Sequence, residues 1–198
     1  MKKLYLFLIT ALISCSVYSQ KNENVKEIPK HKSAVKKIYN ITVPGSAEKV
    51  YNFIINDFSR IYRETSDAHD YFIIRGGGAM KPGCIIDCAE AVKNQSIVHE
   101  YVVEEMKKNK SIYYYSKPSR SIAKVGKKEI EGESNVYVYW LLEEINGSET
   151  KVTFTVITQF NSSFEKFMIN SVLGKYRPWK KHFIEEMEGF KSVYTKKI

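Results

Sequence analysis

The sequence predicts an α+β fold in which a run of antiparallel strands receives one long amphipathic helix at the C-terminal end. Three observations lead to this prediction: periodic apolar residues in the last segment, alternating β-branched segments before it, and short turns between those segments. Short turns join antiparallel neighbours, whereas parallel strands need long crossover connections. Helices do not alternate with the strands, so a doubly wound fold is not expected.

The last segment, residues 163–194, has the spacing of an amphipathic helix. Apolar side chains recur every three or four residues, at Phe164, Phe167, Met168, Val172, Tyr176, Trp179, Phe183, Met187, Phe190 and Tyr194. The remaining positions include the charged residues Glu165, Lys166, Lys175, Lys180, Lys181, Glu185, Glu186 and Lys191. Such a helix lies on a broad apolar surface, and we expect the strands to supply it. Pro178 should kink or divide the helix near Tyr176.

The strands are predicted from alternating and β-branched segments bounded by turn residues. They cover residues 36–43, 84–92, 97–106, 111–117, 135–145 and 151–160, with short further strands at 121–125 and 128–131. Asn146-Gly147 is the strongest hairpin turn. Pro44-Gly45 ends the first strand, and Ser46 caps a helix with a buried stripe at Val50, Phe53 and Ile54. A second short helix is expected at residues 59–67.

The N-terminus has the features of an export signal. Met1-Lys2-Lys3 gives a positive start, and the apolar run at residues 4–13 is too short to span a bilayer. Two cleavage sites compete: Ser19 ends an ordinary signal-peptidase site, whereas Leu12-Ile13-Ser14-Cys15 resembles a lipobox that would leave Cys15 lipidated. We expect a signal peptide at residues 1–19, or a lipoprotein signal at 1–14, then a flexible basic linker at 20–35 and one domain at 36–198. The protein is then periplasmic or secreted, or alternatively a membrane-anchored lipoprotein.

The chain is basic, with a formal net charge of +9, which falls to +7 if Lys2 and Lys3 leave with a signal peptide. For an exported protein this charge favours an anionic membrane surface over a nucleic acid as partner, and no nucleic acid is expected. Cys84 and Cys88 are the two cysteines of the expected domain. On one strand they lie about 13 Å apart, too far for a mutual disulfide.

The chain resembles the START-like superfamily, also called SRPBCC, over about residues 33–198. The resemblance rests on the order of the elements and on three short segments: the entry into a helix at Pro44-Gly45-Ser46-Ala47-Glu48-Lys49-Val50-Tyr51, and the turns Gly76-Gly77-Gly78 and Pro82-Gly83. The similar group is the polyketide cyclase/dehydrase and lipid-transport type, with the helix-grip fold. The resemblance implies a curved antiparallel sheet of about seven strands wrapped around a long C-terminal helix, with two short helices after the first strand. It also implies an apolar cavity between sheet and helix that binds lipids or other hydrophobic molecules, and only some members are enzymes.

Short motifs for catalysis or metal binding are not found in the sequence. His99-Glu100 lacks the second histidine of the zinc-protease helix, and Gly76-Gly77-Gly78 is not the dinucleotide fingerprint. Cys84 and Cys88 do not have the spacing of a zinc site. We therefore expect no metal and no cofactor, and no residue is assigned a catalytic role on a motif.

Two registers are open for the strand at residues 97–106. In one, Val98, Glu100 and Val102 share the concave face, and burial raises the pKa of the Glu100 carboxyl. In the other, the strand is shifted by one residue, and His99 faces the cavity instead. Glu100 and His99 are thus alternative candidates for an acid or base.

Further cavity-lining residues are expected on the faces that meet the closing helix. They are Tyr114, Val138, Trp140, Phe154 and Val156 from the strands, and Met168, Val172, Trp179 and Phe183 from the helix. His182, near Trp179, is expected at the rim, and Arg75 with Asp87 is a candidate pair at the cavity mouth.

Three functions are consistent with this sequence. The first is an exported protein that holds a lipid or other hydrophobic small molecule between sheet and helix. The second is a cyclase/dehydratase-type enzyme that uses Glu100 or His99 as base and a tyrosine hydroxyl as donor. The third is an envelope interaction module with a basic surface.

Overall fold

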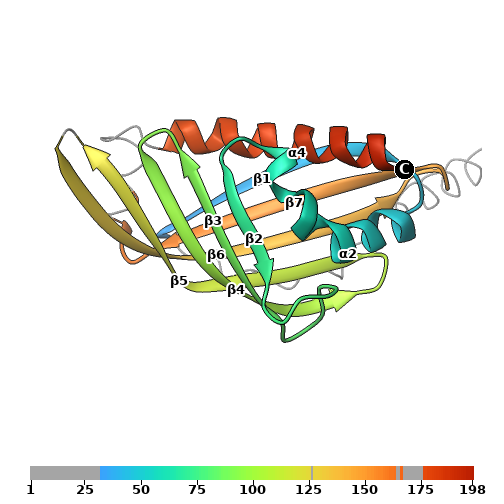
Figure 1. The fold of residues 1–198 in the computed structure, drawn as a ribbon, viewed down its shortest axis with the longest axis horizontal. Helices are drawn as coiled ribbons and strands as arrows, with labels where there is room; N and C mark the ends of the chain where they lie inside the picture. Colours follow the sequence, from blue (N-terminus) through green and yellow to red (C-terminus); the bar gives the residue numbers. More distant parts are fainter. Residues whose placement is uncertain (1–31, 126, 164–165, 167–175) are drawn as a thin grey trace, which may run out of the picture. The chain divides into compact units, whose positions relative to one another are not determined.

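The computed structural model describes residues 32–125, 127–163, 166 and 176–198. The described residues form one seven-stranded antiparallel sheet in the order β1-β7-β6-β5-β4-β3-β2, together with two long helices, α2 and α4 (Figure 1). The strands are β1 (Ala34–Pro44), β2 (His69–Ile74), β3 (Ile85–Val92), β4 (Gln95–Lys107), β5 (Ser111–Val125), β6 (Lys128–Glu144) and β7 (Glu149–Phe160). The helices are α2 (Ala47–Thr65) and α4 (Tyr176–Lys197).

The sheet curves around α4 (Figure 1). Strands β2 to β7 follow one another as antiparallel neighbours, and β1 pairs with β7 along its whole length. Helix α2 joins the two edge strands, β1 and β2, and packs against α4 and β2. The predicted α+β class, with a curved antiparallel sheet and a closing C-terminal helix, is therefore confirmed.

The core lies between the concave face of the sheet and the two helices. Its largest fully buried side chains include Trp140 of β6, Phe58 of α2, and Phe190 and Tyr194 of α4. The Phe58 ring meets Trp140 edge-on, with ring centroids 5.3 Å apart, and Phe190 lies 5.3 Å from Trp140. Aromatic pairs at such distances stabilise a core beyond the burial of their area. Both helices are thereby anchored on the middle of the sheet.

The two short helices predicted after the first strand are one continuous helix of 19 residues, α2. Its apolar stripe continues past Ile54 through Phe58, Ile61 and Tyr62, all buried, and no glycine or proline interrupts it. Ser46 caps its N-terminus as expected, with the side-chain oxygen accepting the Lys49 N–H at 3.4 Å. The polar residues around Ser59 belong to the solvent face of the helix, so they do not mark a break.

Strand β2 was not predicted, because its pairing with β3 shifts register between His69 and Tyr71 and this irregularity breaks the alternation of a strand. The short further strands predicted at residues 121–125 and 128–131 are not separate strands. Their described residues extend β5 and β6 into one long hairpin. The predicted start of the closing helix and a kink before Tyr176 lie outside the described residues, and Pro178 stands in the first turn of α4, where proline is tolerated.

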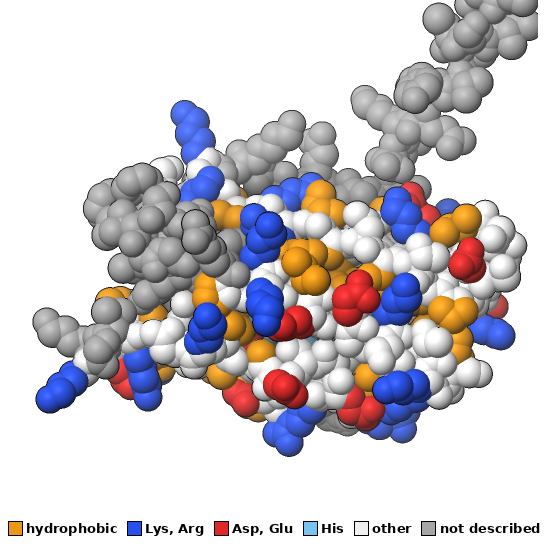
Figure 2. Space-filling view, turned by 90° about the horizontal axis from the view of Figure 1, so that it is seen from above, with side chains coloured by type: hydrophobic (Ala, Val, Ile, Leu, Met, Phe, Trp, Pro, Cys, Tyr) orange, Lys and Arg blue, Asp and Glu red, His pale blue; other side chains and the backbone are white. Residues whose placement is uncertain are grey.

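Charged side chains of both signs cover the domain. Seen from above, lysine and arginine side chains are spread among acidic and apolar ones rather than gathered in one patch (Figure 2). Lys181 and Glu185 of α4, for example, form an ion pair at 2.8 Å. Among the described residues, no helix combines the length and the apolar character needed to span a membrane.

Candidate ligand cavity and its polar wall

A cavity of about 380 Å³ lies between the concave face of the sheet and the helices α2 and α4. Aromatic rings form much of its wall, contributed by Phe58, Tyr62, Phe72, Tyr101, Tyr114, Phe154, Phe160, Trp179 and Phe183. Aliphatic side chains of β6 and β7, among them Val136, Val138 and Val156, fill the spaces between the rings. Small-molecule sites have this combination of apolar lining and few polar groups.

Six of the residues predicted to line a cavity do so in the structure: Tyr114, Val138, Phe154, Val156, Trp179 and Phe183. Trp140 lies behind this wall, fully buried, and its indole N–H donates a hydrogen bond to the Tyr114 hydroxyl at 3.2 Å. Met168 and Val172 lie outside the described residues.

The register of β4 differs from the one that places Glu100 in the cavity. His99, Tyr101 and Val103 are buried, whereas Val98 is 47% exposed and Glu100 points to solvent. Val102 is half-buried and does not reach the cavity. Glu100 and Glu104 lie on the face of β4 that its even-numbered residues share. Because burying unpaired carboxylates is unfavourable, the opposite face, with Tyr101 and Val103, turns inward. The prediction for Val98, Glu100 and Val102 is thereby corrected in favour of the alternative with His99 inward.

Arg75, Asp87 and Glu100 form an ion cluster on the outer face of the sheet. The Arg75 guanidinium donates to both carboxylate oxygens of Asp87, at 2.8 and 2.7 Å, and to Glu100 at 2.5 Å. The hydrogen bonds from Arg75 hold the pKa of Asp87 below its usual range. The predicted Arg75–Asp87 pair exists, but it does not lie at the mouth of the cavity, because these side chains share the face that Glu100 occupies.

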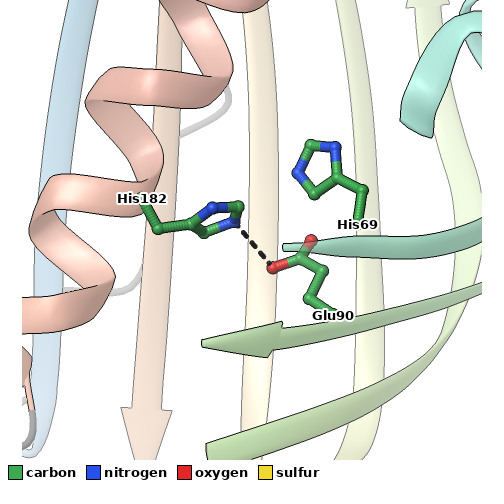
Figure 3. A group of neighbouring side chains, drawn as sticks. All are labelled: His69, Glu90 and His182. Carbon is green, nitrogen blue, oxygen red and sulfur yellow. Dashed lines mark hydrogen bonds and ion pairs between the residues drawn. The ribbon is translucent and has the colours of Figure 1, made fainter. Parts of the chain in front are cut away.

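A buried polar cluster lies beside the cavity (Figure 3). It consists of His69 of β2, Glu90 of β3 and His182 of α4, which are 5%, 7% and 1% exposed. The His182 Nε2 lies 3.3 Å from the Glu90 Oε2, and the His69 and His182 rings meet edge-on at 5.0 Å. Glu90 also lines the cavity, so the cluster borders the space in which a ligand would lie.

Helix α2 supports this cluster from behind. The Tyr62 hydroxyl donates to the Glu90 Oε1, and the Tyr62 ring stacks on His69 with centroids 3.7 Å apart. The Cys88 thiol lies 3.2 Å from the Tyr62 hydroxyl. Burial raises the pKa of the Cys88 thiol well above its ordinary value, so this sulfur is held in the protonated form.

Glu90 and Glu186 are two buried carboxyls in opposite protonation states. Burial disfavours a charged Glu90, but the hydrogen bond and charge of His182 outweigh burial and hold the pKa of Glu90 below its ordinary value. Burial, and then the negative charge of Glu90, raise the pKa of Glu186 to about 8. At neutral pH the cavity therefore contains one ionised carboxylate and one carboxylic acid that can donate a hydrogen bond.

His99 is a further polar residue that lines the cavity. Its Nδ1 lies 2.7 Å from the Ser119 hydroxyl, which donates to the Ser116 hydroxyl at 2.7 Å. The imidazole ring stacks on Tyr101, with centroids 4.6 Å apart. Burial lowers the pKa of His99 to about 4, so the imidazole is neutral at pH 7.

Sequence reasoning missed the roles of Glu186, His182, Glu90 and His69. It placed Glu186 on the charged face of the closing helix and His182 at the rim, yet both are buried. The signal was present in the helix spacing, because His182 and Glu186 are four residues apart and stand next to the buried Phe183 and Met187. His69 and Glu90 had no such signal, since His69 belongs to the strand that was not predicted.

No protein-family model and no curated protein sequence matches the chain. Solved structures do match it. Major latex-like protein 151 from Panax ginseng superposes with a TM-score of 0.57 at 6% identity, over 82% of this chain and 98% of that one. A conserved protein from Geobacillus kaustophilus gives 0.54 at 14% identity, over 82% and 96% of the two chains. A START superfamily protein from Mycobacterium smegmatis gives 0.50 at 12% identity, over 80% and 97%.

The fold and the cavity together define a class: a helix-grip protein with an apolar cavity between its curved sheet and its closing helix. The solved structures show the fold alone, and it is the helix-grip fold that the resemblance seen in the sequence implies.

Proposed function

We propose that the protein binds a hydrophobic or amphipathic small molecule, such as a lipid, in the cavity between the sheet and α4. The observation that carries this proposal is the cavity itself, about 380 Å³ in volume and lined chiefly by aromatic and aliphatic side chains. Removing apolar ligand surface from water there contributes about 25 cal/mol per Å² before the entropy of association is subtracted.

The polar groups of the cavity define what kind of apolar molecule fits best. The Glu186 carboxylic acid is a hydrogen-bond donor, and the neutral His99 adds a further polar contact on the opposite wall. A buried donor is unfavourable when it has no acceptor. The preferred ligand therefore has an apolar body and at least one oxygen atom that accepts a hydrogen bond.

Native mass spectrometry of the protein purified from its own cells tests this proposal, because it detects a bound small molecule directly. A matched pair of variants localises the site. Thr158→Phe adds a ring inside the cavity, whereas Thr153→Phe makes the same change on the outer face of the same strand, β7. We expect ligand occupancy to fall sharply in Thr158→Phe and to persist in Thr153→Phe. Equal occupancy in the two variants would contradict binding in this cavity.

A second candidate function is catalysis of a cyclase/dehydratase type on a hydrophobic substrate. The observation that favours it is His99, a neutral imidazole that faces the cavity and is oriented by Ser119. A neutral imidazole can accept a proton from a bound substrate. If this is the function, His99→Ala retains the bound molecule but abolishes its conversion. If the first function is correct, wild-type protein and His99→Ala release the same molecule, because the protein binds the ligand without converting it.

We also propose that the protein is exported, on the strength of the signal-like residues 1–19. The intact mass of the protein from cell fractions distinguishes the two cleavage routes. Cleavage after Ser19 gives a chain that begins at Gln20, and a lipoprotein route gives an acylated chain that begins at Cys15. A Cys15→Ser variant cannot be acylated, so the acylated form should disappear in it if the lipoprotein route is used. An uncleaved chain in the cytoplasm would contradict export.

A further inference from the structure

We propose that His69, Glu90 and His182 form a binding site for one divalent first-row transition-metal ion, with Zn²⁺ the best match. The three side chains come from β2, β3 and α4 and turn toward one another (Figure 3). One potential ligand atom from each lies within 4.8 Å of the other two, and all three side chains are buried. This site is separate from the proposed function and does not depend on it.

The unpartnered nitrogen of His69 is the first argument. The His69 Nδ1 lies 2.8 Å from the Tyr62 carbonyl oxygen. A carbonyl oxygen only accepts, so Nδ1 carries the proton and Nε2 bears a free lone pair. His69 Nε2 is buried and has no hydrogen-bond partner among the described residues. Buried polar atoms are nearly always paired, so a lone pair held in this way calls for a cation or for a hydrogen-bond donor from outside the described residues.

The other two residues are oriented in the same manner. The His182 Nδ1 lies 3.3 Å from the Ser66 hydroxyl, which leaves Nε2 directed at the Glu90 Oε2. A metal ion would replace the proton that the His182 Nε2 donates to Glu90, and that proton would be released to solvent. The Glu90 Oε1 is engaged by the Tyr62 hydroxyl. Each of the three side chains thus has one atom fixed by residues of α2 or its C-cap, and a second atom directed into the cluster. Metal-binding histidines and carboxylates are typically held by outer hydrogen bonds of this kind.

The donor set selects the class of metal. Two imidazole nitrogens and one carboxylate oxygen are the ligands of many zinc sites, and of iron(II) sites that keep open positions. Mg²⁺ and Ca²⁺ prefer oxygen ligands throughout. Two ligands at about 2.1 Å from a tetrahedral ion lie roughly 3.4 Å apart, and His182 Nε2 and Glu90 Oε2 are already 3.3 Å apart. The other separations, up to 4.8 Å, must shorten by roughly 1 to 1.5 Å, which a side-chain rotation can supply.

Three protein ligands leave a fourth position for water or for an oxygen of another molecule. Because Glu90 and Tyr62 also line the cavity, the ion would stand at the cavity wall. The three ligands are 21 and 92 residues apart in the sequence. No short motif connects them, so their spacing in the sequence does not predict a metal site.

The test uses the full chain, treated with chelator and then titrated with Zn²⁺ by isothermal calorimetry. We expect one ion per chain and a higher melting temperature with the metal. Co²⁺ in place of Zn²⁺ should give the visible absorption of a four-coordinate ion with nitrogen and oxygen ligands. His69→Gln, Glu90→Gln and His182→Gln should each weaken binding at least about 100-fold. His99→Gln is the matched control, because His99 is a buried histidine outside the cluster, and it should retain the wild-type metal affinity.

A folded wild-type chain that binds neither Zn²⁺ nor Co²⁺ stoichiometrically would overturn the proposal and leave the cluster as an ion pair within the protein. Binding that survives in all three ligand variants would overturn it as well. Should the ligand variants fail to fold, Ser66→Ala decides the matter, because it removes only the hydroxyl behind His182. Metal affinity about tenfold lower in Ser66→Ala supports the site, and unchanged affinity contradicts it.

Discussion

Gly189 of α4 lies directly against the Thr65 carbonyl oxygen at the end of α2. A Cβ atom added at Gly189 would stand 1.9 Å from that oxygen and 2.7 Å from the carbonyl carbon. Both atoms belong to the backbone, so they cannot move aside as a flexible side chain does. Residue 189 thus sets how closely α4 approaches the helix that joins the two edges of the sheet.

Gly189→Ala should therefore destabilise the protein, although alanine favours helix formation by about 1 kcal/mol over glycine. We expect the free energy of unfolding to fall by about 3 kcal/mol, because the two helices must separate to admit the methyl group. Glu188→Ala is the control, since Glu188 is exposed in the same turn and should change stability by less than about 0.5 kcal/mol. Urea titrations of both variants provide the comparison, and a stabilised Gly189→Ala would refute the close approach.

Two buried tyrosines should respond in opposite ways to the loss of the hydroxyl. The Tyr114 hydroxyl accepts the indole N–H of Trp140, whereas the Tyr194 hydroxyl is buried without a partner among the described residues. Tyr114→Phe leaves a buried N–H unpaired and should cost about 1–3 kcal/mol. Tyr194→Phe removes an unpaired polar atom, so its stability should equal or exceed that of wild type. Thermal melts of the two variants decide the point, and equal losses in both would show that the two hydroxyls have similar surroundings.

The sequence predicts the fold well where apolar periodicity is regular. The closing helix, the first strand and the central strands have clear patterns, and the strongest hairpin turn, Asn146-Gly147, joins β6 to β7 as expected. The pattern fails where structure is irregular. Strand β2 begins with a register shift next to His69, and the polar face of α2 near Ser59 imitates a break in the helix.

The polar part of the site could be predicted less well than its apolar wall, for a physical reason. Buried carboxyls and histidines depend on partners that are distant in the sequence. Glu186 resembles any solvent-facing residue of an amphipathic helix until Glu90 and His182 are placed beside it. Likewise, the choice between His99 and Glu100 depended on strand register. Asp87 lies opposite Glu100 on the neighbouring strand β3, and Arg75, which follows β2, binds both carboxylates on the outer face.

Stability should depend on pH through His99. Burial lowers the pKa of His99 to about 4, below its value of about 6.5 in the unfolded chain. Between these values the unfolded chain binds the proton and the folded chain does not, so this contribution to stability is complete above pH 6.5 and is lost as the pH falls toward 4. In His99→Gln, which keeps a polar group near Ser119, this dependence should disappear. Urea titrations at several pH values give the difference between wild type and variant, and parallel pH profiles for the two proteins would contradict a buried neutral His99.

The last prediction concerns which carboxyl contacts the ligand. Glu186 lines the cavity and is protonated at neutral pH, whereas Glu100 lies in the ion cluster on the outer face. Glu186→Met removes the hydrogen-bond donor and should weaken binding of an oxygen-containing apolar ligand by about tenfold, since one hydrogen bond is worth about 1 kcal/mol or slightly more. Glu186→Gln keeps a donor and should retain most of the affinity. Displacement of a fluorescent fatty acid from the cavity measures these changes.

Glu100→Met is the matched control for this experiment, because it makes the same substitution in a carboxyl that the sheet separates from the cavity. Its affinity for the fatty acid should equal that of wild type, and only the outer ion pair with Arg75 should be lost. An exposed ion pair of this kind contributes little to stability, because solvent screens it, so the variant also remains folded. If Glu100→Met weakens binding as much as Glu186→Met does, the ligand does not lie against α4, and the outer face of the sheet becomes the surface to which it binds.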